Sequence, residues 1–110
     1  MKKIRKFKSG ADRDLDDGKL DFEGFISPLV LKRFGEYMHF HRTRKDGTYR
    51  ESDNWQKGIS RDAYIKSAYR HFQDWHLHHR DFSKQAKEDL ETALCALLFN
   101  VAGYLFEELK

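Results

Sequence analysis

The sequence has few residues that cross-link a chain or interrupt its secondary structure, with one cysteine and one proline among 110 residues. One cysteine excludes an internal disulfide, and Cys95 stands in an apolar run where a thiol commonly packs as a small hydrophobic side chain. No run approaches the about 18 apolar residues of a membrane span, and no apolar stretch follows the basic N-terminus as in a signal peptide. We therefore expect a cytoplasmic protein that does not enter a membrane.

A strong charge of one sign is also absent. The 21 basic residues stand against 18 acidic ones, and a net charge of +3 makes nucleic acid an unlikely main partner. With 39% hydrophobic and 15% aromatic residues, the chain has enough core-forming side chains for one folded domain. Residues 1–26, a basic block followed by an acidic one, are expected to form an extended N-terminal arm ahead of a helical domain at residues 27–110.

Two segments carry a helix start signal followed by helical periodicity. Ser27 can cap the free N–H groups of a helix and Pro28 suits its first position, which predicts a first helix to about His41. Ser60 can cap a second helix at about 61–80 in the same way.

A third helix is expected from about Ala86 to Leu109. Its residues 93–106 are apolar nearly all round, which is typical of a helix buried on every side. A monomer of three helices can hardly cover such a helix. We therefore expect a homo-oligomer that uses residues 93–106 as its interface.

Between the first two helices, residues 42–58 form a long basic loop. Loops of this length in small domains often have a function, and charge-assisted hydrogen bonds to phosphate oxygens are one possibility. A solvated basic loop is the alternative reading. The cations concerned are Arg42, Arg44, Lys45 and Arg50.

One edge of the second helix carries Ser67, His71, Asp74 and His78, spaced so that their side chains line up. Two imidazoles flanking a carboxylate are suited to a divalent metal, or to an Asp74 that orients His71 as a general base. Hydrogen bonds along the helix surface are the simpler alternative. In sum, the sequence predicts an all-α fold: a small helical bundle of three main helices with the extended arm and the long basic loop.

Several segments together resemble the mainly phage-encoded dATP/dGTP diphosphohydrolase N-terminal domains, which are related in fold to the all-α, MazG-like nucleotide pyrophosphohydrolases. The resemblance covers most of the chain and depends on the order and spacing of the segments. They are Ser9 to Asp14 with Gly18-Lys19, the run ISPLVLKRFGEYM, Asn54-Trp55 with Lys57-Gly58, Arg70-His71 with Trp75, and the run EDLETALCALLFN.

The resemblance implies hydrolysis of dATP or dGTP to the monophosphate and pyrophosphate, with Mg²⁺ or Mn²⁺ as cofactor. Enzymes of this class hold the metal with acidic pairs from neighbouring helices. Here the nearest equivalents are Glu36-x-x-His39 and His71-x-x-Asp74, with Glu88, Asp89 and Glu91 opening the third helix. His78-His79 stands where the family has an acidic pair. Imidazole ligands shift the preference of a site toward manganese.

On this reading each candidate residue has a role. Glu36, His71 and Asp74 are the candidate catalytic residues, and the metal ligands are Glu36, Asp74 and Asp89. The candidate substrate-binding residues are Asn54, Trp55, Lys57 and Arg70. The other reading is a non-catalytic phage accessory protein in the host cytoplasm, one that sequesters a nucleotide or inhibits a host defence protein.

Overall fold

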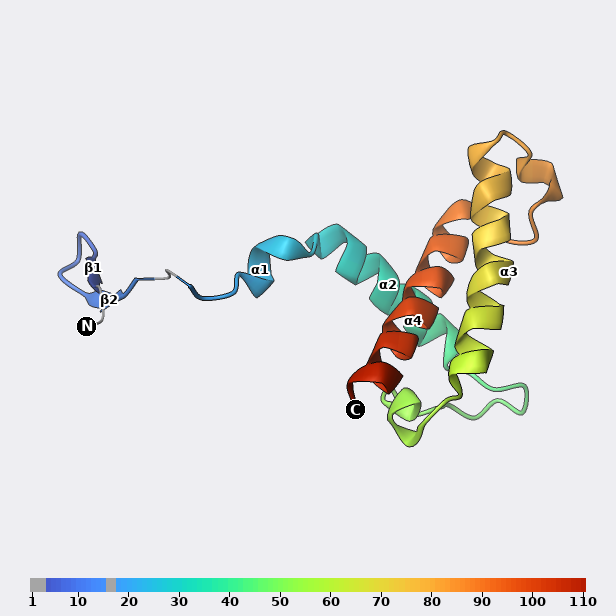
Figure 1. Cartoon of the computed structure of the whole chain (residues 1–110), viewed down its shortest axis with the longest axis horizontal. Helices are drawn as coiled ribbons and strands as arrows, with labels where there is room; N and C mark the ends of the chain where they lie inside the picture. Colours follow the sequence, from blue (N-terminus) through green and yellow to red (C-terminus); the bar gives the residue numbers. More distant parts are fainter. Residues whose placement is uncertain (1–3, 16–17) are drawn as a thin grey trace.

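The computed structural model describes residues 4–15 and 18–110. The chain begins with a small hairpin, passes through an arm, and ends in a bundle of three helices (Figure 1). The parts of the predicted arm at residues 1–3 and 16–17 lie outside the described residues. The arm projects from the bundle, so the molecule measures 59 × 36 × 27 Å.

The all-α prediction needs one correction, because the arm contains a two-stranded antiparallel sheet. Strands β1 (Ile4–Lys6) and β2 (Asp12–Asp14) pair with Lys6 opposite Asp12. Gly10 turns the chain between them with a φ of 89°, which favours glycine. The hairpin therefore places residues 4–6 of the basic block beside residues 12–14, where the acidic block begins. A one-turn helix, α1 (Phe22–Phe25), follows.

Helix α2 (Pro28–His41) begins and ends where the sequence predicts. The Ser27 hydroxyl accepts a hydrogen bond from the Leu29 N–H at 3.2 Å, and Pro28 occupies the first turn. The helix docks on the bundle from Arg33 onward, where Arg33 forms an ion pair of 2.7 Å with Glu91. The start of α2 points away from the bundle with α1 (Figure 1).

The predicted loop between α2 and the next long helix is ordered by its own hydrogen bonds. Thr43 and Tyr49 form an antiparallel bridge, and the Arg50 N–H donates to the Arg42 carbonyl at 2.8 Å. Asp46 accepts from the N–H and the hydroxyl of Thr48, which closes the turn. A short 3-10 helix, η1 (Asn54–Lys57), then leads to the next helix.

The core lies between α3 (Arg61–His79) and α4 (Leu90–Leu109), which pack side by side. Ser60 caps α3 as predicted, accepting from the Ala63 N–H at 3.1 Å. The side of α4 that faces inward carries mostly small residues. Its buried residues are Ala93, Cys95, Ala96, Asn100 and Gly103. Burial raises the pKa of the Cys95 thiol.

The start of α4 differs from the prediction. The helix begins at Leu90 and not near Ala86, because Asp89 caps it and a short 3-10 helix, η2 (Ser83–Gln85), precedes it.

By length and composition α4 would also suit a membrane span, with a mean hydropathy of 1.3. In this structure it packs against α2 and α3, but several of its large apolar side chains stay exposed.

Candidate functional site

The edge of α3 that carries His71, Asp74 and His78 faces the segment joining α3 to α4. The Nδ1 atom of His71 contacts the Oε1 atom of Glu88, and both side chains are about three-quarters shielded from solvent. The sequence placed Glu88 among the acidic residues that open the third helix, but it did not predict its contact with His71. Glu88 stands 17 positions beyond His71, where helical spacing gives no information.

Asp74 and His78 form hydrogen bonds with the same segment between α3 and α4. The buried Asp74 carboxylate accepts a hydrogen bond from the Lys87 N–H at 3.1 Å. His78 lies 2.8 Å from the Glu88 carbonyl through Nε2 and 2.9 Å from the Ser83 hydroxyl through Nδ1. A neutral imidazole with its hydrogen on Nε2 satisfies both partners, donating to the carbonyl and accepting from the hydroxyl.

Through these contacts the α3 edge has a structural role. Three side chains, one helical turn apart, fix residues 83–88 against α3 and so set the position at which α4 begins. His71 uses its Nδ1 atom in these contacts, Asp74 uses Oδ1, and His78 uses both ring nitrogens. The edge predicted from spacing is present, and its partners lie within the chain.

The proposed metal ligands Glu36, Asp74 and Asp89 are not gathered into one cluster in the described part of the chain. Glu36 is exposed on α2, whereas Asp89 accepts the Thr92 N–H at 2.7 Å as the cap of α4. Hydrogen bonding from Thr92 lowers the pKa of the Asp89 carboxyl. Over residues 4–15 and 18–110, no three His, Cys, Asp or Glu side chains gather in a way that would hold a metal ion.

A second place in the fold does bring predicted residues together. A pocket of about 550 Å³ opens between the end of α2 and the segment leading to α3, and Asn54 and Trp55 lie in its wall. Ligand pockets commonly have volumes of about 300–1,000 Å³. The other lining residues are Tyr37, Met38, His39, His41, Arg42, Arg50, Glu51, Ser52, Ile59 and Phe99.

Aromatic rings form the apolar part of this pocket. Tyr37 and His41 are one turn apart on α2, and their ring centroids lie 4.2 Å apart. Trp55 is held edge-on against Phe106 of α4, with centroids 4.7 Å apart. Partial burial raises the pKa of the Tyr37 hydroxyl, which stays protonated at neutral pH. The rings of Tyr37 and His41 therefore both belong to the side of α2 that borders the pocket.

Two arginines form the polar part. The Arg42 Nε donates to the Arg50 carbonyl at 2.9 Å, and one terminal nitrogen of Arg50 donates to the His41 carbonyl at 3.1 Å. Each guanidinium has five N–H donors, so each keeps donors for a ligand after making its backbone bond. The backbone bonds fix both side chains before a ligand arrives, which reduces the entropy cost of binding. Arg44, by contrast, donates to Thr48 and Tyr49 of its own hairpin.

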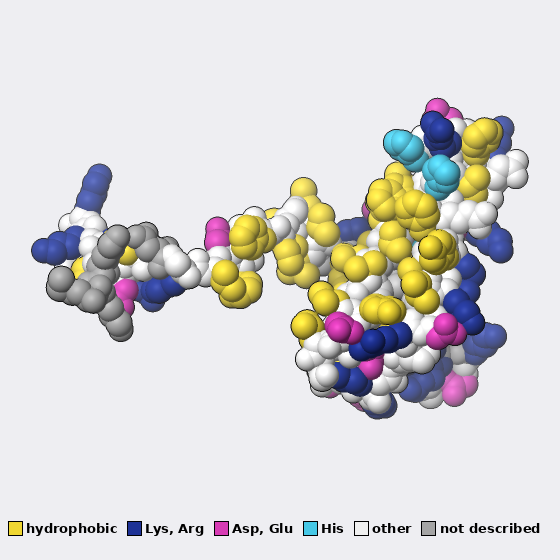
Figure 2. Space-filling model, in the orientation of Figure 1, with side chains coloured by type: hydrophobic (Ala, Val, Ile, Leu, Met, Phe, Trp, Pro, Cys, Tyr) yellow, Lys and Arg dark blue, Asp and Glu magenta, His cyan; other side chains and the backbone are white. Residues whose placement is uncertain are grey.

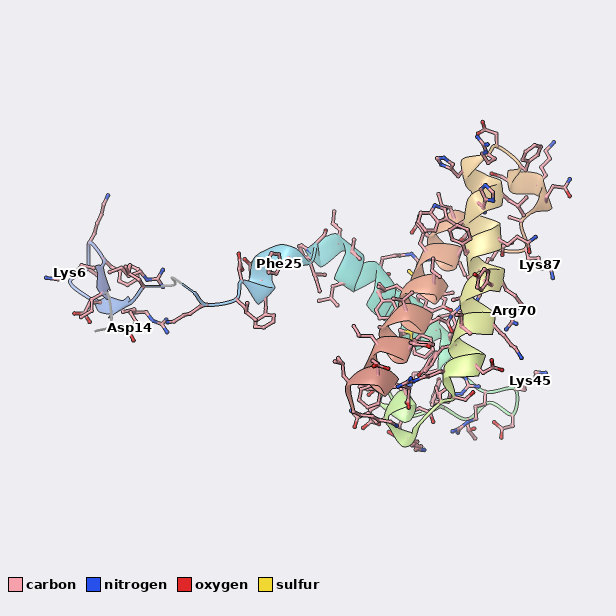
Figure 3. The ribbon with its side chains drawn as sticks, in the orientation of Figure 1. Lys6, Asp14, Phe25, Lys45, Arg70 and Lys87 are labelled. Carbon is pink, nitrogen blue, oxygen red and sulfur yellow. The ribbon has the colours of Figure 1, made fainter. Side chains whose placement is uncertain are left out.

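Lys57 and Arg70, the other predicted substrate-binding residues, do not line this pocket. Lys57 ends η1 and is exposed. Arg70 is exposed on α3, on the side of the molecule that also presents Lys45 and Lys87 (Figure 3). The structure therefore divides the predicted site between the pocket, the α3 edge and the outer surface of α3.

No protein-family model, curated protein or solved structure matches this chain.

Proposed function

We propose that this protein binds a purine nucleotide in the pocket between α2 and η1. The observation that carries the proposal is the convergence of Trp55 and Asn54 with Arg42 and Arg50 around one space of about 550 Å³. The proposal keeps the base-binding residues expected from the sequence and assigns the phosphate contacts to the loop arginines. It supports the reading of a protein that sequesters a nucleotide.

The aromatic part of the pocket suits the base of a nucleotide, and the cationic part suits its phosphates. A purine has apolar faces and a polar edge, for which aromatic rings and the Asn54 amide are suitable partners. Phosphate oxygens are anionic acceptors, and arginine binds them through two parallel N–H groups. Arg42 and Arg50 bring two positive charges to the lining, and Glu51 is its one carboxylate.

Hydrolysis of dATP or dGTP remains a second proposal, supported by the sequence resemblance. The described residues do not assemble a metal site in one chain. Turnover would therefore require carboxylates contributed by a second copy or by a partner. We keep this activity as a separate arm of the test and do not assign it a catalytic residue.

Isothermal titration calorimetry against dATP, dGTP, deoxyadenosine and inorganic triphosphate tests the binding proposal. We expect the nucleotides to bind more tightly than either fragment, because the aromatic and cationic parts of the pocket are then both occupied. Pyrophosphate release with added Mn²⁺ is measured in parallel. Binding without turnover supports sequestration, whereas turnover supports the hydrolase reading.

Variants then test the position of the site. Arg42→Gln and Arg50→Gln should each weaken dATP binding by about tenfold or more, since a hydrogen bond to a charged group contributes about 1.5–3 kcal/mol. Arg70→Gln is the matched control, because Arg70 is exposed and lies outside the pocket. Loss of binding in Arg70→Gln, with Arg42→Gln unaffected, would place the nucleotide elsewhere. Far-UV circular dichroism checks that each variant is folded.

A further inference from the structure

The chain exposes far more surface than a compact protein of its size. Its accessible surface is 9667 Å², whereas a compact monomer of 13.2 kDa is expected to expose about 6,400 Å². The radius of gyration is 19.6 Å, compared with about 13 Å for a compact chain of this length. The excess surface exceeds the about 800 Å² per partner that a specific interface buries.

Part of this surface belongs to the arm. Phe25 in α1 is 78% exposed and lies in the arm, away from the bundle (Figure 3). Its apolar neighbours in α1 and at the start of α2 are also more than half exposed, although contiguous exposed apolar side chains are rare in monomers. These neighbours are Phe22, Ile26, Leu29, Val30 and Leu31.

The rest lies on the bundle, along the boundary of α3 and α4. An apolar groove of about 490 Å³ opens there, and its walls include Ile65 and Ala68 of α3 and Val101 and Leu105 of α4. Hydrophobic side chains form a broad patch over these helices, and a second series follows α1 and α2 (Figure 2). Leu94, Leu98, Val101 and Leu105 are spaced by four, three and four residues, which places them along one stripe of α4.

The arm cannot cover the groove of its own chain in this conformation. Helix α2 is anchored to α4 by the Arg33–Glu91 ion pair and by the contact of Cys95 with the Arg33 carbonyl. From this anchor, the start of α2 and α1 continue away from α3 and α4 (Figure 1). The chain thus presents an apolar helical segment and an apolar groove on separate parts of one molecule.

We infer that two copies of this chain form a dimer by exchanging arms, with the apolar face of residues 22–31 of each copy in the α3–α4 groove of the other. Each chain supplies one arm and one groove. In a dimer with two-fold symmetry, both arms can therefore occupy both grooves at the same time. One contact type then buries the exposed face of α4 and the exposed face of the arm. The inference does not depend on nucleotide binding.

Sedimentation equilibrium on the full chain tests the dimer. We expect a species of twice 13.2 kDa. Phe25→Asp in the arm and Leu105→Asp in the groove should each weaken association by at least about 30-fold, because each places a carboxylate in a buried apolar contact. Both side chains are substantially exposed within one chain, so the monomer should remain helical by circular dichroism.

Phe40→Asp is the matched control. Phe40 is 75% exposed, nearly as much as Phe25, but lies near the other end of α2, so this variant should remain dimeric. An equimolar mixture of the Phe25→Asp and Leu105→Asp chains should associate again. The first chain keeps an intact groove and the second an intact arm, so one of the two contacts can form.

Three results would overturn the inference. One is a wild-type chain that stays monomeric at all concentrations. Another is a Phe25→Asp chain that dimerises like wild type, which would indicate that α4 faces pair without the arm. The last is a monomeric wild-type chain that floats with phosphatidylcholine vesicles, which would make a lipid surface the partner of the apolar face.

Discussion

The ring of Tyr64 on α3 packs directly over Gly103 on α4. Tyr64 is 2% exposed and is the largest fully buried side chain among the described residues. A Cβ atom placed on Gly103 would overlap the ring and lie 2.6 Å from its hydroxyl oxygen. The absence of a side chain at position 103 therefore sets how closely the two helices approach, and the core forms around this contact.

Substituting Gly103 should cost stability although alanine favours helices. In Gly103→Ala the overlap with Tyr64 forces the helices apart, and overpacking of this kind costs about 1–3 kcal/mol. Gly35→Ala is the control, because Gly35 is also helical but has no atom within 4 Å of the added Cβ. Urea unfolding should show Gly35→Ala to be more stable than wild type by about 0.5–1 kcal/mol. Equal effects at the two positions would contradict the close contact.

The hydroxyl of Tyr64 should contribute little to stability. Its oxygen is buried and has no hydrogen-bond partner among the described residues, and burial raises its pKa. Tyr64→Phe removes the cost of burying an unpaired hydroxyl and keeps the ring over Gly103. We expect thermal unfolding to give a midpoint equal to or above that of wild type. A loss of more than about 1 kcal/mol would indicate a hydrogen bond to this hydroxyl.

The α3 edge should act on stability. Asp74→Ala leaves the Lys87 N–H without its acceptor and should cost about 1–3 kcal/mol, whereas Asp74→Asn keeps an acceptor oxygen and should cost less. For His71 and Glu88, a double-mutant cycle to alanine should give a coupling energy of about 0.5–3 kcal/mol. Urea unfolding measures both. A catalytic role would instead predict lost turnover with unchanged stability.

Acid should destabilise the protein partly through Asp89. Its pKa is lowered in the folded chain, so its contribution is present above the unfolded value of about 3.9 and is lost as pH falls through the folded value. Asp89→Asn keeps the cap oxygen but does not titrate. Its unfolding midpoint should therefore fall less steeply than that of wild type below about pH 4. Parallel curves for the two proteins would contradict a role for this ionisation.

The starts of two helices could be predicted from the sequence because the interactions that fix them are local. The starts of α2 and α3 follow from Ser27-Pro28 and Ser60, whose side chains cap the neighbouring N–H groups. The N-terminal hairpin was missed, although opposite charges flank Gly10, because the short strands have no alternating apolar pattern. The start of α4 was placed too early because residues 86–88 bond to α3 and do not extend the helix.

The sequence by itself determined that His71, Asp74 and His78 share one edge of a helix, since a repeat of 3.6 residues decides this within a single element. Only the tertiary structure decided what faces that edge, because Glu88, Lys87 and Ser83 arrive there through the packing of α4 on α3. The same holds for Trp55, which packs against Phe106 of α4 although the two residues are far apart in the chain. Side-chain spacing is a property of one helix, whereas a site depends on which helices meet.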